Sequence, residues 1–203
     1  MEVLFVFLNI AAAKKLFKRA FNGHGLRVAI HEERLYIAGL GWEIEMNNGI
    51  APYKLKAAIV ELCGRLPDAY EQFLATKDGL QEELPVGKSV YDRYLKAKKF
   101  LDETPVIIDK KYRMYKLFQH REDHDFTLID MERLSLIDIR EVDTEHGEGL
   151  PCGPCSETEH WSSPVFWHST CGTLCLHPSE GETELDDEIL DALRMIHFEG
   201  GNT

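Results

Sequence analysis

The fold is decided by residues 26–46, LRVAIHEERLYIAGLGWEIEM. Apolar and polar residues alternate in three short runs of this stretch, which is the pattern of strands with one buried face. The connections between the runs are too short for parallel crossovers, so neighbouring strands must be antiparallel. We therefore expect a hairpin or small meander whose buried face carries Leu26, Val28, Ile30, Leu35, Ile37, Trp42, Ile44 and Met46.

Further helical and strand patterns surround this meander. Apolar residues recur at helical spacing in four segments, which are residues 11–21, 52–66, 89–101 and 183–196. Strand-like runs occur at residues 3–8, 73–84, 106–108, 112–119 and 126–139. This order predicts an α+β fold, in which antiparallel sheets are covered by amphipathic helices.

The element order also carries a resemblance. The meander at residues 26–46, followed by a helix from Pro52, is similar to the repeated half-domains of DNA sliding clamps. The similarity extends over roughly half of the chain and rests on the order of its elements. It implies an accessory protein that binds nucleic acid through basic helices, here residues 11–21 and 89–101.

Four of the five cysteines fall within 24 positions. They form two close pairs separated by fifteen residues, a spacing that can supply four thiolates to one tetrahedral Zn²⁺ ion. Four thiolates leave no open coordination position, so we expect a structural zinc held by Cys152, Cys155, Cys171 and Cys175. One imidazole could replace a thiolate, from His160, His168 or His177.

The first cysteine pair has a second interpretation. Cys152-Gly153-Pro154-Cys155 is also the redox pair of thioredoxin-like proteins, in which the first thiolate lies at a helix N-terminus. The residues around it are loop-like, which favours the metal over a thiol-disulfide oxidoreductase. No Gly-rich phosphate loop, nucleophile elbow or zincin pattern occurs in the sequence, so we expect a protein that is not an enzyme.

Charge is distributed unevenly along the chain. The net charge is −12, with 19 Lys and Arg against 15 Asp and Glu in residues 1–120, and 4 against 20 in residues 121–203. The acidic surface that residues 121–203 would form should repel polyanions and attract basic partners. We therefore divide the chain into an α+β body, residues 1–142, and an acidic zinc-knuckle module with a C-terminal helix, residues 143–203.

These observations lead to one principal functional hypothesis. It is a regulatory or inhibitory interaction protein whose acidic surface docks on a basic protein partner, for example the basic groove of a nucleic-acid enzyme. The residues expected to bind the partner lie at the start of the last helix: Asp186, Asp187, Glu188 and Asp191. The alternatives are the clamp-like nucleic-acid-binding protein and the thiol oxidoreductase.

Membrane insertion is not expected. The longest apolar run, residues 3–13, is about half of the roughly 20 residues that a membrane-spanning helix needs. The chain begins Met1-Glu2, which is acidic where an export signal would be basic. We expect a cytoplasmic protein.

Overall fold

The alternating stretch forms three adjacent antiparallel strands, β1 (Leu26–His31), β2 (Arg34–Gly39) and β3 (Trp42–Asn47). The computed structural model describes residues 7–83, 89–110, 112–138, 151–179 and 187–198. Leu26, Val28, Leu35, Ile37 and Ile44 are fully buried, as the alternation predicts. The prediction of an antiparallel meander is confirmed.

These strands belong to an eleven-stranded sheet with the order β5-β4-β1-β2-β3-β11-β10-β9-β6-β7-β8. Every neighbouring pair in it is antiparallel. The remaining strands are β4 (Glu71–Thr76), β5 (Gly79–Glu82), β6 (Lys99–Lys110), β7 (Arg113–His120), β8 (Phe126–Asp130), β9 (Cys152–Ser156), β10 (Val165–Ser169) and β11 (Gly172–Leu176).

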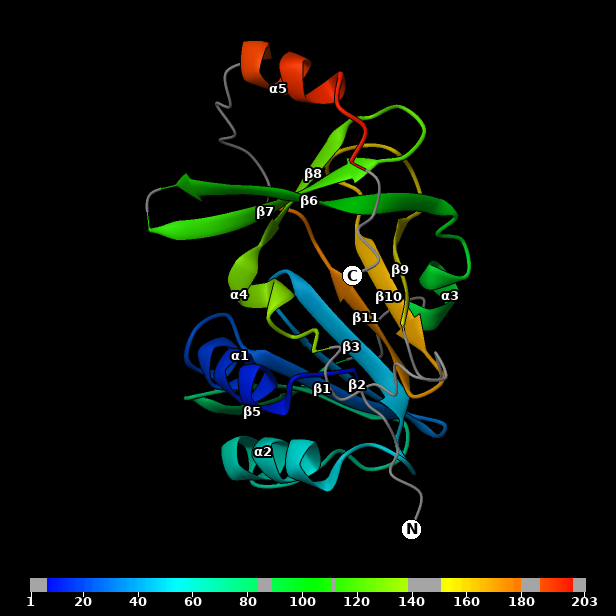
Figure 1. Ribbon diagram of the computed structural model, residues 1–203. Helices are drawn as coiled ribbons and strands as arrows, with labels where there is room; N and C mark the ends of the chain where they lie inside the picture. The colour runs from blue at the N-terminus through cyan, green and yellow to red at the C-terminus, as the bar shows by residue number, and fades with distance from the viewer. Residues whose placement is uncertain (1–6, 84–88, 111, 139–150, 180–186, 199–203) are drawn as a thin grey trace.

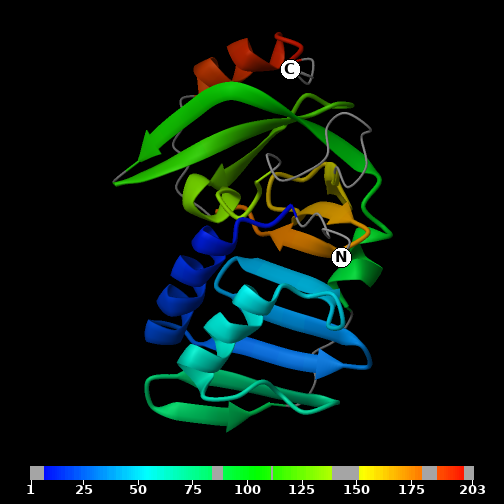
Figure 2. The ribbon, with the colours of Figure 1, turned by 60° about the horizontal axis from the view of Figure 1, so that its bottom comes forward.

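Two helices cover one face of this sheet. They are α1 (Ile10–Asn22) and α2 (Tyr53–Cys63), which lie side by side across the strands of the N-terminal part (Figure 2). The side chain of Asn9 caps α1 by accepting a hydrogen bond from the amide of Ala12, and Gly64 ends α2 in a left-handed conformation. The N-terminal part of the sheet therefore has one face buried under helices.

The principal core lies between these helices and the sheet. Leu16 and Phe17 of α1 and Leu55 and Ile59 of α2 pack with the inward residues of β1–β4 in a single apolar cluster. The same cluster continues to Leu174 of β11. The core thus joins residues from both ends of the described chain.

The most consequential strand pair is β3 with β11. Gly172 lies opposite Met46 and Leu176 lies opposite Trp42, so a segment near the C-terminus sits in the middle of the sheet (Figure 1). On its other side β11 pairs with β10, β10 pairs with β9, and β9 pairs with β6. The sheet therefore contains strands from both of the expected units, residues 1–142 and 143–203. The expected boundary between the two units falls outside the described residues.

Two predicted segments differ in the structure. The helix expected over residues 89–101 is short, α3 (Val90–Tyr94), and β6 begins at Lys99. The strand expected over residues 126–139 ends at Asp130, whose side chain accepts a hydrogen bond from the amide of Glu132 and caps α4 (Met131–Leu134). In both segments local capping and strand pairing outweigh the apolar periodicity.

The last helix, α5 (Asp187–Arg194), lies outside the β6–β8 layer (Figure 1). Leu190 and Leu193 pack against a small cluster formed by Leu117, Phe126 and Leu128. Residues 183–186 of the helix expected over residues 183–196 lie outside the described part, as does most of the strand expected at residues 3–8. None of the described helices is long and apolar enough to span a membrane.

The shared core leads to a prediction about cooperativity. Leu174→Ala should lower the free energy of unfolding by about 2–5 kcal/mol, because a fully buried leucine is replaced by a cavity. Amide hydrogen exchange should show lost protection in α2 as well as in β11. Leu95→Ala, at a side chain that is 47% exposed, is the control and should change stability little. Protection that persists in α2 of the Leu174 variant would mean two independently stable modules.

Candidate functional site

The face of the sheet that α1 and α2 leave uncovered is polar where β1–β3 cross it. The outward residues of these strands include Arg27, Arg34, Tyr36, Glu43 and Glu45. They line a cavity of about 890 Å³, together with Ser89, Asp92 and Arg93 and with His177 beyond β11. A cavity rich in charged groups that sits on a rigid sheet is the principal candidate for a functional site.

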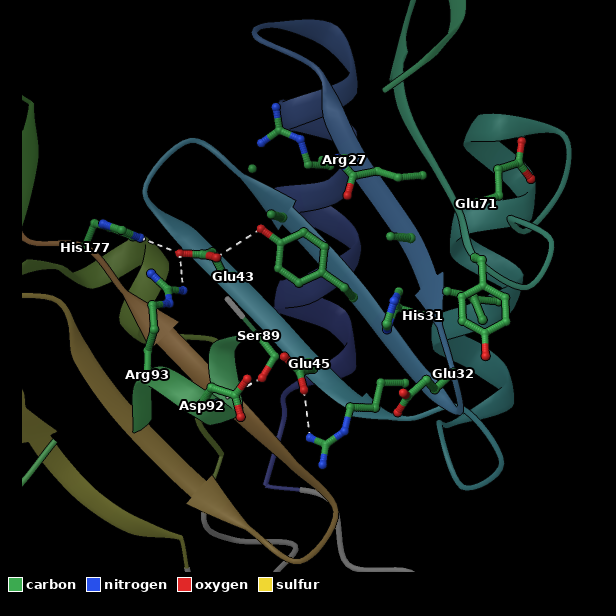
Figure 3. A pocket seen from close by; sticks show the side chains of 18 residues that line it. Arg27, His31, Glu32, Glu43, Glu45, Glu71, Ser89, Asp92, Arg93 and His177 are labelled. Carbon is green, nitrogen blue, oxygen red and sulfur yellow. Dashed lines mark hydrogen bonds and ion pairs between the residues drawn. The ribbon is translucent and has the colours of Figure 1, made fainter. Parts of the chain in front are cut away.

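Glu43 is the centre of the best-connected cluster in this cavity. His177 Nε2 and Arg93 Nη2 each lie 2.7 Å from Glu43 Oε1, and the hydroxyl of Tyr36 donates a hydrogen bond of 2.9 Å to Glu43 Oε2. Figure 3 shows Arg93 and His177 converging on Glu43. The Cys175 Sγ atom lies 3.8 Å from the same His177 Nε2.

The charge state of this cluster follows from its contacts. Burial disfavours the ionised form of Glu43, but hydrogen bonds from His177 and Arg93 outweigh it and hold its pKa at about 2. Burial, together with the nearby Glu43 charge, raises the pKa of the Cys175 thiol well above its ordinary value. Glu43 is therefore a carboxylate at neutral pH and Cys175 is a protonated thiol.

This arrangement does not match a cysteine nucleophile. In a nucleophile–imidazole–carboxylate triad the two ring nitrogens are divided between the nucleophile and the carboxylate. Here the single atom His177 Nε2 faces both Cys175 Sγ and Glu43 Oε1. The three side chains instead bring a sulfur, a nitrogen and an oxygen atom within 4.8 Å of one another, which are atom types that bind metal ions.

A second carboxylate, Glu45, has a positioning role. It is 3% exposed and forms an ion pair of 2.7 Å with Arg34. Its other oxygen accepts a hydrogen bond of 2.6 Å from the amide of Val90, the first residue of α3. Glu45 thereby fixes α3 on the sheet, and α3 carries Arg93 to Glu43.

The four predicted zinc ligands are not brought together. Cys155 on β9 and Cys175 on β11 both lie opposite Phe166 of β10, so two strand spacings of roughly 4.8 Å each separate them. Cys171 lies in the β10–β11 turn and packs in the principal core, whereas Cys152 is exposed. A zinc ion holds its sulfurs within about 4 Å of one another, so the four-thiolate zinc knuckle is not confirmed.

The histidines that could have replaced a thiolate have different partners. His160 Nδ1 lies 2.7 Å from the hydroxyl of Ser162, and His168 stacks on Tyr94. His168 lies opposite Cys152 in the β9–β10 pairing, and the side-chain contact of His177 with Cys175 is the one such histidine–cysteine contact among the described residues.

The redox interpretation of the first cysteine pair gains no support from its surroundings. Cys152 and Cys155 lie on strand β9 and not at a helix N-terminus. Burial and the neighbouring Cys152 raise the pKa of Cys155 to about 12.

The predicted partner-binding carboxylates are only partly described. Asp186 and the side chain of Asp187 lie outside the described part of the chain. Glu188 and Asp191 are exposed on α5, and Asp191 forms an ion pair of 2.6 Å with Arg194. The same Arg194 contacts Asp125 at 2.8 Å, so these acidic groups are partly neutralised.

A second candidate surface is the outer face of α1. Lys14, Lys15, Lys18 and Arg19 are all exposed and lie within an arc of about 140° around the helix. Arg19 contacts Glu132, whereas no ion pair involves the three lysines within the described residues. The exposed Lys54 lies on the neighbouring helix α2.

Comparisons with known proteins give only a loose structural likeness. No protein-family model matches the chain, and no curated protein is significantly similar to it in sequence. A DNA polymerase III beta chain from Streptococcus pneumoniae aligns with 87% of the chain at 9% identity and a TM-score of 0.32. A putative DNA polymerase III beta subunit from Eubacterium rectale aligns with 89% at 10% identity and a TM-score of 0.30. The chain spans 64% and 66% of the lengths of these two proteins.

The lowered pKa of Glu43 generates a prediction about acid stability. Folding lowers this pKa from 4.5 to about 2, so the stabilisation is complete above about pH 4.5 and is lost as the pH falls toward 2. The contribution is on the order of 3 kcal/mol. Urea unfolding of the wild type should therefore show a steeper loss of stability between about pH 5 and pH 2 than Glu43→Gln does. Parallel curves of unfolding free energy against pH for the two proteins would contradict the lowered pKa of Glu43.

Proposed function

We propose that the protein is a non-enzymatic accessory protein that contacts the phosphate backbone of a nucleic-acid duplex through α1 and α2. The observation that carries this proposal is the row of Lys14, Lys15 and Lys18 on the outer face of α1. The helix contains four basic residues and no acidic one. Such a face neutralises phosphates and releases their counterions, which is the main source of sequence-independent affinity.

The structural support of this face suits a rigid contact. Leu16 and Phe17, on the opposite side of α1, are buried in the principal core, so the lysines project from an anchored helix. The neighbouring α2 adds Lys54 and Lys56, although Lys56 Nζ also donates a hydrogen bond to the carbonyl of Asn48. The aromatic Phe17 faces the core and is unavailable for stacking on bases. The proposed contact is therefore to the backbone and not to the bases.

The acidic-docking hypothesis has less structural support. Several carboxylates of residues 121–203 are engaged within the protein: Glu122 and Glu159 contact Lys99, Asp125 and Asp191 contact Arg194, and Glu132 contacts Arg19. Carboxylates that are paired internally offer less to a basic partner. The excess of negative charge has another consequence, which is that nucleic-acid binding should be weak and strongly dependent on salt.

The proposal predicts a site-specific loss of binding. The triple variant Lys14→Glu, Lys15→Glu, Lys18→Glu should abolish binding to a fluorescently labelled DNA duplex at low salt, measured by anisotropy. In a version with the lysines changed to Gln, the slope of log K against log salt should become shallower by roughly three, since about three phosphate contacts are lost.

The matched control has the same change in net charge at another place. Lys77, Lys96 and Lys98 are exposed lysines outside α1 and α2. Lys96 and Lys98 belong to the second basic segment expected from the sequence, but α3 ends at Tyr94 and carries neither, so the combined change of the three to Glu should leave most of the affinity. Equal losses in the two triple variants would show that α1 has no special part. Wild-type protein without measurable affinity for duplex DNA or RNA at low salt would refute the proposed function.

A further inference from the structure

Three different metal-ligating atoms meet at the junction of β3 and β11. The strand pairing places Cys175 directly opposite Glu43, and His177 follows two residues later on the same face. The Glu43 carboxylate, the Cys175 sulfur and the His177 imidazole have ligand atoms within 4.8 Å of one another. Among the residues the structure describes, this is the one such group of three.

We infer that Glu43, Cys175 and His177 bind a single Zn²⁺ ion, with a fourth coordination position open to the adjacent cavity. A mixture of sulfur, nitrogen and oxygen ligands suits zinc, whereas Mg²⁺ and Ca²⁺ take oxygen ligands almost exclusively. Three protein ligands complete all but one position of a tetrahedron, and solvent from the cavity supplies the fourth. This is a different site from a closed set of four thiolates.

The interatomic distances fit this ion after small movements. With zinc bonds of about 2.0–2.3 Å, tetrahedral coordination places the sulfur about 3.6 Å from the nitrogen and the nitrogen about 3.4 Å from the oxygen. The Cys175 Sγ to His177 Nε2 distance is 3.8 Å and the His177 Nε2 to Glu43 Oε1 distance is 2.7 Å. The carboxylate and the imidazole must therefore separate by about 0.7 Å. The His177 side chain is 38% exposed and lies beyond the end of β11, so it has room to make this movement.

Arg93 is the group that competes with the ion. Its guanidinium lies against Glu43 and supplies the positive charge at the centre of the cluster. Arg93 Nε is buried and has no hydrogen-bond partner among the residues that the structure describes. When zinc binds, the Cys175 thiol releases its proton to solvent, and the two negative ligands balance the two charges of the ion. Arg93 then becomes surplus and turns toward the cavity that it already lines.

The test is a titration of the full-length, chelator-treated protein with Co²⁺, followed by displacement with Zn²⁺. The wild type should bind one equivalent of Co²⁺ with a thiolate-to-cobalt charge-transfer absorption, which Zn²⁺ abolishes. Cys175→Ser should remove this absorption. His177→Ala should weaken Co²⁺ binding at least about tenfold, and its partly exposed position preserves folding. Arg93→Met should strengthen binding, because it removes the competing cation.

The matched controls are the cysteines that the structure places elsewhere. Cys155→Ser and Cys171→Ser should keep both the stoichiometry and the absorption, with circular dichroism confirming that every variant is folded. Loss of metal binding in these variants would support the four-thiolate zinc knuckle and overturn the inference. The inference would also be overturned if neither the wild-type protein nor the Arg93→Met variant binds Co²⁺ with a thiolate-to-cobalt absorption.

Discussion

The pairing of β3 with β11 is the constraint on which the rest of the structure depends. It joins strands that are about 130 residues apart in the chain and closes two groups of strands into one continuous sheet. Its close approach also restricts the sequence, because a Cβ atom at Gly172 would come within 2.8 Å of the Glu45 carbonyl oxygen and 2.9 Å of Met46 Cβ. The pair determines which side chains meet on each face, since residues opposite one another in a ladder project to the same side.

The two faces of this sheet have different physical roles. On one face, Ile44 and Leu174 continue the apolar core beneath α1 and α2, which supplies stability. On the other face, the largely buried Glu43 and the buried Glu45 each have a cationic partner, Arg93 and Arg34 respectively. Ion pairs of this kind contribute specificity of arrangement as much as stability, because removal of one partner leaves an uncompensated buried charge. The polar face therefore fixes α3 and the cavity beside it.

The two candidate surfaces follow from this division. The helices that cover the apolar face must expose their other side, and in α1 that side is basic. The other face presents Glu43 and His177 to the cavity, with the buried Cys175 next to them. The surfaces lie on opposite faces of the sheet, so a ligand of one need not obstruct a ligand of the other. The proposals for nucleic-acid contact and for zinc can consequently be tested separately.

The local elements of the fold were predictable from the amino-acid sequence. Alternation over residues 26–46 predicted β1–β3 with their buried residues, and helical periodicity predicted α1 and α2, because these patterns depend on neighbours within a few positions. It also indicated cysteine and histidine as metal ligands, but grouped Cys175 with Cys152, Cys155 and Cys171, which are near in sequence. The tertiary structure alone places Cys175 opposite Glu43. Strand partners at long separation are selected by the packing of the whole sheet, and no spacing in the sequence records that choice.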